Sequence, residues 1–385
     1  MFERVFKLSE HKTTVKTEVM AGITTFMTMA YILAVNPSVL GSTGMDTTAV
    51  LLATALASCL GTLCMAFMAN LPFALSAGMG LNAFMAYTVV AGYGYSWQVA
   101  LLAVFIEGLI FIVLSLTNVR EAIFNAIPLT LKKGVSVGIG LFIAFIGLQN
   151  SGLCVDSATL VGIISFPENF HTAGICALLT LIGLFFTAVF YTRKMKGAIL
   201  YGILLTWILG MLCQVTGLYV PTPDAGFYSL FPSWGMTDFS KLGLTFGQCF
   251  NVDFSAVGIV NFIVVIFSFL FVDIFDTLGT LIGVATKAKM LDKDGKLPGI
   301  KSALLADSIA TSAGAILGTS TTTTFVESAS GVAVGGRTGL TALVTGILFL
   351  VSTLFAPIFT AIPSFATAPA LILSLIHISE PTRQA

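Results

Sequence analysis

Long apolar runs separated by short polar connections dominate the chain. A helix that crosses a membrane needs about 20 mostly apolar residues, and eleven stretches fit this pattern. They lie at 17–38, 48–69, 71–91, 97–117, 131–150, 173–191, 197–219, 256–286, 299–317, 319–336 and 338–357. A twelfth apolar stretch begins near Phe365 and stops at Ser379, short of a full crossing. The pattern predicts an all-α polytopic membrane protein with about 11–12 spans.

Two of these spans are interrupted by small and polar residues. The third contains LSAGMGLNAFMAY, from Leu75 to Tyr87, and the tenth contains LGTSTTTTFVESASGVAVGGRTG, from Leu317 to Gly339. Non-helical backbone at membrane depth is tolerated only when it is buried in protein or lines a cavity. Paired interrupted spans therefore point to the binding site of a transporter.

The ordinal places of the interrupted spans indicate an internal repeat. If span 3 corresponds to span 10, spans 1–7 correspond to spans 8–14 with inverted orientation, because seven is odd. We therefore expect about two to three further helices after residue 372. The final letters, SLIHISEPTRQA, resemble a translated adaptor read-through, so we expect 373–385 to be a non-native tail. The alternative is a protein with eleven or twelve helices.

Composition supports the membrane setting and excludes other classes. Hydrophobic residues make up 56% of the 385 residues, charged residues 9%, and the mean hydropathy is +0.98. A typical soluble domain carries about 25% charged residues. This composition excludes a soluble enzyme, a nucleic-acid binder and a disordered chain. The sequence has no P-loop, H-E-x-x-H or C-x-x-C motif, so we expect no ATPase, no metal and no other cofactor.

The basic residues indicate the orientation. With the N-terminus inside, 16 of the 18 Lys and Arg residues fall on the inner side, and only Lys241 falls outside, with Arg383 left in the tail. The positive-inside rule then predicts a protein of the plasma or inner membrane with a cytoplasmic N-terminus at 1–16. The connection at 220–255 reads as an extracellular loop that can hold a short interfacial helix. Its turn and interface residues are Pro221, Pro223, Pro232 and Trp234.

Acidic residues inside the spans are the first candidates for chemistry. They are Glu107, Asp273, Asp276, Asp307 and Glu327. Intramembrane acids are costly and usually functional, and no Lys or Arg lies within a span to neutralise them. Such acids can carry protons, which favours a cation- or proton-coupled carrier over an anion carrier. Asp273 and Asp276 share one helix face, and Thr277 and Thr280 extend it as a polar stripe.

Polar residues in the interrupted spans are candidates for binding a ligand. The Glu327 carboxylate can accept two N–H bonds from an amide-like edge, or it can cap the half-helix that follows. Asn82 offers both donors and acceptors to a neutral polar ligand, or it satisfies a helix end. Aromatic side chains that can stack on a flat ring are Phe26, Tyr31, Phe84, Phe271 and Phe325.

Three further charged residues have weaker claims. Glu107 can bond across helices, and Asp307 can pair with Lys301 near the inner surface. Arg337, in GGRTG, marks the inner end of the tenth span.

Four motifs together resemble one family of carriers. They are GITTFMTMAYILAVNP (22–37), GMGLNAF (78–84), FVDIFDTLGTLIG (271–283) and GTSTTTTFVESASGVAVGGRTGL (318–340). From about residue 3 to 372 the chain is similar to the adenine/guanine/hypoxanthine permease branch of the xanthine/uracil permease (nucleobase:cation symporter) superfamily. The family usually has Ala-Pro before GMGLN, whereas this chain has Ser76-Ala77, which can loosen the entry to span 3.

The resemblance implies a fold of fourteen spans in two inverted seven-helix repeats, with a short strand and a half-helix in spans 3 and 10. The core domain would comprise 17–117 and 256–357. The gate domain would comprise 118–219 and the start of an incomplete repeat at 358–372, with 220–255 joining the halves. The gate would then be incomplete, which leaves open whether this chain can transport a substrate.

The resemblance also implies an importer of purine nucleobases (hypoxanthine, guanine or adenine) by proton symport, with the core moving against the gate and with homodimers as a frequent assembly. Asp273 and Glu327 would hold the base, and Asn82 would contact or shape the site. Proton coupling or support of the site would fall to Asp276, Thr277 and Thr28. Ring contacts would come from Phe325, Phe84 and Phe271.

Other functions stay open at this point. A transporter of the same fold could carry xanthine, uracil or an inorganic anion, although an anion carrier should offer a basic residue or an uncharged site. A membrane scaffold or receptor would bind without accumulating its ligand. The choice among purines, and between a proton and sodium as the coupling ion, also stays open.

Overall fold

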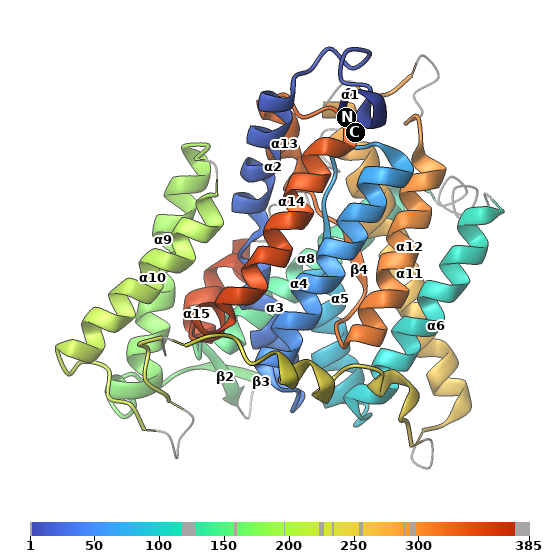
Figure 1. Ribbon diagram of the computed structural model, residues 1–385. Helices are drawn as coiled ribbons and strands as arrows, with labels where there is room; N and C mark the ends of the chain where they lie inside the picture. The colour runs from blue at the N-terminus through green and yellow to red at the C-terminus, as the bar shows by residue number, and fades with distance from the viewer. Residues whose placement is uncertain are drawn as a thin grey trace.

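The computed structural model shows a bundle of long helices that run roughly alongside one another (Figure 1). The structure describes residues 2–117, 128–157, 160–195, 197–222, 227–232, 235–253, 257–287, 290–292 and 297–373. The predictions for Pro223, Trp234 and the tail from residue 374 onward therefore lie outside the described residues.

The first half of the chain supplies seven membrane segments. The short α1 (Phe2–Phe6) precedes them. The first three segments are α2 (Val15–Met29) with α3 (Ile32–Gly41), then α4 (Thr47–Cys64) with η1 (Met65–Ala69), then β1 (Leu75–Ala77) with α5 (Met79–Ala83) and η2 (Phe84–Gly92). The other four are α6 (Trp97–Leu116), α8 (Leu129–Asn150), η3 (Phe170–Gly174) with α9 (Ile175–Thr192), and α10 (Ala198–Val215). A two-stranded hairpin, β2 (Cys154–Ser157) with β3 (Leu160–Ile163), lies between α8 and η3.

The second half repeats the beginning of this order. It contains η5 (Phe239–Leu244), η6 (Gln248–Phe250), α11 (Ile259–Lys287), α12 (Ile300–Leu317), β4 (Thr322–Thr324) with α13 (Ser328–Val334), α14 (Gly339–Ser352), η7 (Thr353–Phe355) and α15 (Ala356–Thr360). A further short apolar helix covers Ser364–Leu373, where the sequence predicted the start of a twelfth apolar stretch.

The predicted spans correspond to these elements in order. Eight of them are helices long and apolar enough to cross a membrane within the described part of the chain. The third and tenth spans are shorter because a strand and a half-helix replace the continuous helix, and α8 contains the shorter apolar stretch Gly140–Asn150. The prediction of an all-α polytopic fold with two interrupted spans is therefore confirmed.

The two interrupted spans meet through their strands. β1 and β4 pair antiparallel, with Leu75 opposite Thr324, Ser76 opposite Thr323 and Ala77 opposite Thr322. The Gly78 N–H donates to the Thr321 carbonyl (3.0 Å), and the Phe325 N–H donates to the Ala74 carbonyl (2.9 Å), which continues the pairing beyond both strands. This arrangement confirms the short strands that the resemblance implied in spans 3 and 10.

Side chains from flanking helices satisfy the outer edges of this small sheet. The Thr62 hydroxyl of α4 accepts from the Leu75 N–H (3.0 Å) and donates to its carbonyl (3.2 Å). The Thr311 hydroxyl of α12 donates to the Thr322 carbonyl (2.9 Å). Backbone groups at this depth need such partners because the bilayer offers none, so the Thr- and Ser-rich neighbours make the interrupted spans tolerable.

Small residues allow the central helices to approach closely. A methyl group at Gly61 would lie 2.6 Å from the Ala310 Cβ, which places α4 directly against α12. At the edge of the molecule α9 and α10 pack in a reciprocal way: Gly183 faces Thr206, and Gly202 faces Thr187. Close backbone approach of this kind is the usual basis of helix association in membranes.

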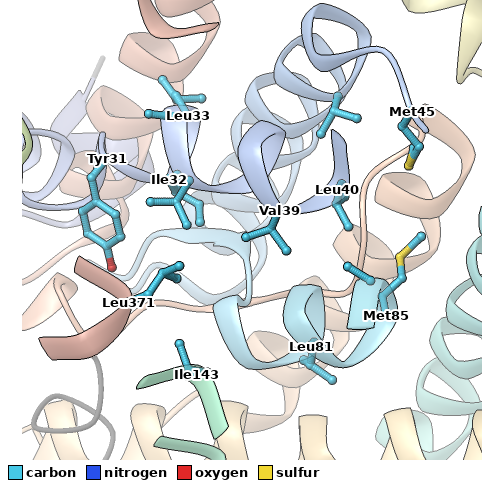
Figure 2. Packing of buried hydrophobic residues seen from close by; sticks show 14 of the residues in the cluster. Tyr31, Ile32, Leu33, Val39, Leu40, Met45, Leu81, Met85, Ile143 and Leu371 are labelled. Atoms are coloured by element: carbon cyan, nitrogen blue, oxygen red, sulfur yellow. The ribbon is translucent and has the colours of Figure 1, made fainter. Parts of the chain in front are cut away.

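Apolar side chains from distant segments fill the space beside the sheet (Figure 2). Tyr31, Ile32 and Leu33 of the α2–α3 region are buried, and the same cluster includes Leu81 of α5 and Leu371 near the end of the described chain. This packing fixes the α2–α3 junction against the half-helix of span 3.

The connection at 220–255 crosses one end of the bundle (Figure 1). It contains the two short 3₁₀ helices η5 and η6, and their predicted place at the membrane interface stays a prediction. Lys241 pairs with Asp46 at 3.0 Å, and the Thr245 hydroxyl donates to the Leu317 carbonyl (2.9 Å), so this part of the connection is attached to α4 and α12. The earlier part is attached to α10, because the Trp207 indole donates to the Leu230 carbonyl (2.8 Å).

Candidate functional site

Most of the sequence-predicted polar residues gather around the paired strands. The half-helices α5 and α13 begin directly after β1 and β4, and α11 and α12 contact β4. Among the residues that the structure describes, no group of three His, Cys, Asp or Glu side chains is placed to hold a metal ion. The polar side chains around the strands carry carboxyl, amide and hydroxyl groups.

Thr277 links the acidic residues of α11 and α12 to β4. Its hydroxyl oxygen lies 2.9 Å from Asp273 Oδ1, 3.1 Å from Asp307 Oδ1 and 2.8 Å from the Thr323 hydroxyl. All four side chains are buried. A hydroxyl has one proton to donate, so the two carboxyl groups share a single donor at this point.

Asp307 needs a correction relative to the sequence analysis. It was expected to pair with Lys301 near the inner surface, yet its side chain is fully buried against Thr277, while Lys301 is exposed. The physical reason is helical geometry: positions 301 and 307 differ by nearly two turns, so Asp307 lies deeper in the bundle. Asp307 thus belongs with Asp273.

Glu327 lies at the start of α13 and is contacted from span 1. Its side chain makes no capping hydrogen bond to the helix that follows. Instead, the Tyr31 hydroxyl donates to Glu327 Oε1 at 2.5 Å, and the Thr28 hydroxyl lies 3.5 Å from the Glu327 carbonyl oxygen. From the sequence Tyr31 was a candidate for ring contacts, and its hydrogen bond to Glu327 was missed.

Asn82 is buried in α5 with one side of its amide engaged. Its Oδ1 accepts a hydrogen bond from the Ser320 hydroxyl, and its Nδ2 has no hydrogen-bond partner among the described residues. A buried donor without a partner is costly. The amide nitrogen of Asn82 is thus a group that a ligand with an acceptor atom could satisfy.

Three consecutive residues before β4 are each held by a polar side chain of the first half. Thr319 accepts from Asn36 Nδ2 (2.9 Å), Ser320 contacts Asn82, and the Thr321 hydroxyl donates to Glu107 Oε2 (2.8 Å). The expected bond of Glu107 across helices is therefore present. The role of Asn36 was missed, because a lone Asn in an apolar span gives no sign of a partner 283 positions away.

Asp276 faces the entry to α5. Its Oδ2 lies 3.3 Å from the point where a Cβ at Gly78 would sit, and Thr323 Cγ2 lies 2.7 Å from the same point. Gly78 therefore lies close to both β4 and α11.

The aromatic candidates separate into two groups. Phe325 is buried beside Glu327, and Phe84 packs edge-on against Phe269 with ring centroids 5.0 Å apart. Phe271 is 41% exposed and packs against Phe275. It lies two positions before Asp273 on α11, so the two side chains leave the helix on nearly opposite sides. Phe26 packs against Phe349. Phe325 and Phe84 therefore remain candidates for ring contacts, whereas Phe271 lies away from the cluster.

Two charged residues organise the end of the tenth span, where α13 gives way to α14. The Arg337 guanidinium donates to the Val332 and Gly336 carbonyls (2.7 Å each), so it closes the end of α13. The Glu18 carboxylate, which the sequence analysis did not consider, accepts from the Arg337 N–H (2.9 Å) and from the Thr341 hydroxyl (2.6 Å). Glu18 thereby ties the start of α2 to the start of α14.

Interrupted spans that pair at the centre of a helical bundle and carry buried acids are typical of the binding site of a membrane transporter. The same fold is seen in the transmembrane domain of a cyanobacterium bicarbonate transporter, BicA, with a TM-score of 0.65 at 15% identity over 94% of this chain and 88% of that chain.

Sequence comparison then identifies the family. The model of the xanthine/uracil permeases, described as the permease family, matches residues 16–379, and the chain belongs to this family. The guanine/hypoxanthine permease PbuG of Bacillus subtilis is 46% identical over 96% of this chain and 81% of that relative. The adenine permease AdeP of Escherichia coli is 43% identical over 97% of this chain and 79% of that relative. The chain is thus a multi-pass membrane transporter and not an enzyme.

Proposed function

We propose that the protein imports purine nucleobases, with hypoxanthine, guanine and adenine as the candidate substrates. The observation that carries this proposal is the combination of the Glu327 carboxylate and the unpartnered Asn82 amide nitrogen beside the paired strands. Together they offer an acceptor and a donor, which is what the mixed N–H and C=O or ring-nitrogen edge of a neutral purine requires. The names of the relatives PbuG and AdeP agree with this substrate class.

Asp273 supplies the second acidic contact in this proposal, and Phe325 and Phe84 supply ring contacts. Within the described residues of the cluster, the side chains are carboxyl, amide, hydroxyl and aromatic groups, and Arg337, beyond the other end of α13, is engaged by two carbonyls. This set suits an uncharged heterocycle better than an inorganic anion.

Proton symport is the coupling that the acids support. Asp273 and Asp307 share the Thr277 hydroxyl, and Asp276 lies one turn from Asp273 at the entry to α5. Carboxyl groups grouped in a buried setting can exchange a proton as the ligand enters and leaves. Asp276, Thr277 and Thr28 serve coupling or support of the site in this proposal, and no cofactor takes part besides the coupling ion.

Alternating access would move a core domain of 17–117 and 256–357 against a gate domain that includes 118–219 and 358–372. The protein would lie in the plasma or inner membrane with its N-terminus in the cytoplasm, and it would form a homodimer. The attachment of 237–250 to the core helices and of 227–232 to α10 supports a division within the 220–255 connection.

Uptake of radiolabelled hypoxanthine, guanine and adenine tests the proposal in cells that lack their own purine permeases. We expect concentrative uptake that competes with unlabelled purines, and loss of uptake in Glu327→Gln. Normal uptake by Glu327→Gln would remove Glu327 from the site. If unlabelled bicarbonate but not unlabelled purine competed for uptake, the substrate class would be an inorganic anion and not a purine.

The coupling ion is tested in proteoliposomes. An imposed inward proton gradient should drive accumulation without sodium, and a protonophore should abolish it. Accumulation that follows a sodium gradient alone would assign sodium instead of the proton.

A further inference from the structure

Tyr31 lies where span 1 changes direction and reaches across to span 10. α2 ends at Met29 and α3 begins at Ile32, so Tyr31 belongs to the junction between them. Its side chain is 1% exposed. The ring packs in the cluster shown in Figure 2, whereas the hydroxyl donates to Glu327 Oε1 at 2.5 Å.

The polarity of this bond is fixed by chemistry. A phenol is the donor when its partner is a carboxylate, because an ionised carboxylate can only accept. A charge-assisted O–H···O⁻ bond of this length is among the stronger hydrogen bonds in proteins. The partner residues are 296 positions apart, so the bond joins the two halves of the chain at the candidate ligand group.

The α2–α3 region holds Glu327 at two points. The Thr28 hydroxyl lies 3.5 Å from the Glu327 main-chain carbonyl oxygen, and Tyr31 bonds the carboxylate. A Glu side chain has several rotatable bonds, and fixing them before a ligand arrives lowers the entropic cost of binding. The bond to Oε1 leaves Oε2 as the oxygen that is not bound by Tyr31.

We propose that Tyr31 is a positioning residue of the nucleobase site. It orients the Glu327 carboxylate so that Oε2 accepts a ring N–H of the ligand, while Tyr31 occupies Oε1. This inference rests on the proposed function, and it adds a second residue of span 1, beside Thr28, to a site built mainly from spans 3, 8, 9 and 10. Tyr31 acts through Glu327 and not through its own contact with the base.

Tyr31→Phe isolates the hydroxyl, because it keeps the buried ring. We expect the KM for hypoxanthine uptake, and the Kd measured on purified protein, to rise about tenfold, the size of one lost charge-assisted hydrogen bond. The maximal uptake rate should stay within about twofold, since translocation does not use this bond. A purely structural role would instead lower the amount of folded protein and the maximal rate, with KM unchanged.

Tyr219→Phe is the matched control. Tyr219 is also buried, and its hydroxyl donates to the Tyr228 carbonyl (2.7 Å) in the connection, away from the paired strands. The variant Tyr219→Phe loses the same hydroxyl group at a place that makes no contact with Glu327, so its KM for hypoxanthine should match that of the wild type. A KM for Tyr31→Phe within twofold of the wild type would overturn the proposal, as would an equal rise in Tyr219→Phe.

Glu327→Gln separates failure of this inference from failure of the proposed function. If the wild type takes up no purine, the proposed function fails; if it does and Glu327→Gln transports normally, purine import stands, but Glu327 is not in the site and the positioning role of Tyr31 is wrong. If Glu327→Gln loses uptake while Tyr31→Phe keeps its KM, only the positioning role is wrong. Where Glu327→Gln retains measurable binding, adding Tyr31→Phe should cause little further loss, because Tyr31 acts through the group already changed.

Discussion

At the scale of single residues, two buried asparagines hold neighbouring positions of the chain in different ways. Asn36 Nδ2 donates to both Thr54 (2.6 Å) and Thr319 (2.9 Å). Asn82 accepts from Ser320 and leaves its Nδ2 without a partner in the part of the chain that the structure describes. Among the described residues Asn36 Oδ1 also has no partner, so the two asparagines differ in the group that is left over: an acceptor in Asn36, whose amide nitrogen already joins two threonines, and a donor in Asn82.

Alanine substitution should separate these two roles. Asn82→Ala should raise the KM for hypoxanthine about fivefold or more, because it removes a donor worth about 1 kcal/mol or more to the ligand. Asn36→Ala should leave KM unchanged and lower the free energy of unfolding by about 1–3 kcal/mol, because two buried hydroxyls lose their donor. Uptake kinetics and thermal unfolding in detergent measure the two effects, and a raised KM in Asn36→Ala with a normal Asn82→Ala would reverse the assignment.

The residue scale is also where sequence reasoning is weakest. Intramembrane acids stand out because they are rare, so Asp273, Asp276, Glu107 and Glu327 could be predicted as functional candidates. Tyr31 could not be assigned its bond, because tyrosine is common at such positions and its partner is 296 positions away. Glu18 was overlooked because it lies near the predicted membrane edge, where a charge is ordinary, although it is fully buried.

At the scale of elements, the antiparallel pair β1–β4 brings the two halves of the chain together. Gly78 ends β1 and begins α5 in an extended conformation, and a methyl group there would lie 2.7 Å from Thr323 Cγ2 and 3.3 Å from Asp276 Oδ2. This close approach depends on glycine for space and not for a special backbone angle, since its φ is −69°.

Gly78→Ala should therefore damage transport by displacing β4 or Asp276. We expect a loss of uptake of about tenfold or more, together with a destabilisation of about 1–3 kcal/mol from overpacking. Gly279→Ala is the control on α11, because no atom lies within 4 Å of its added methyl group. It should keep uptake and gain up to about 1 kcal/mol in stability from helix propensity. Equal uptake by the two variants would show that the site tolerates the methyl group.

Asp46 anchors another element, the start of α4. Burial raises the pKa of its carboxyl, but hydrogen bonds from the Ala49 and Thr48 N–H groups and from Lys241 outweigh burial, so the net pKa lies below its ordinary value. A carboxyl whose pKa is lowered by folding stabilises the protein above its unfolded pKa, and this stability is lost as the pH falls through its folded pKa.

Asp46→Ala should consequently lower the free energy of unfolding by about 1 kcal/mol at pH 7, mainly through loss of the helix cap. The difference from wild type should shrink as the pH drops below about 4. Glu10→Ala removes the exposed pair of Glu10 with Lys7 and should change stability by less than about 0.5 kcal/mol. Thermal unfolding in detergent at several pH values measures these differences, and a deficit of Asp46→Ala that grows toward low pH would contradict the sign.

Much of the element order could be predicted, because a membrane span needs length and apolar character that a single sequence displays directly. The strands in the interrupted spans followed from the family resemblance. The hairpin β2–β3 and the junction at Tyr31 could not be predicted. The hairpin lies in a short mixed segment without clear alternation, and the junction is set by packing of span 1 against span 10.

At the scale of the whole molecule, few described polar bonds connect the proposed core to the proposed gate. One of them joins η2 of span 3 to the end of α8, where the Tyr87 hydroxyl donates to Asn150 Oδ1 at 3.0 Å. If the core moves against the gate, this contact is between the moving parts. A hydrogen bond present in one state and broken in the other biases the equilibrium between them by its own free energy.

Tyr87→Phe should accordingly shift the balance between inward-open and outward-open forms away from the state shown here. A bond worth about 1 kcal/mol corresponds to a shift of about fivefold. The shift can be measured as a change in the labelling rate of single cysteines placed on the two sides of the site. Tyr219→Phe is the control, because the Tyr219 hydroxyl bonds within the connection and not between core and gate.

Tyr87→Phe leaves every proposed ligand-binding residue intact, so the intrinsic affinity for hypoxanthine in either state should not change. The apparent Kd should move only by the change in population of the binding-competent state. An unchanged labelling pattern in Tyr87→Phe would mean that Tyr87 and Asn150 move together, and the boundary between core and gate would then have to be placed elsewhere than between spans 3 and 5.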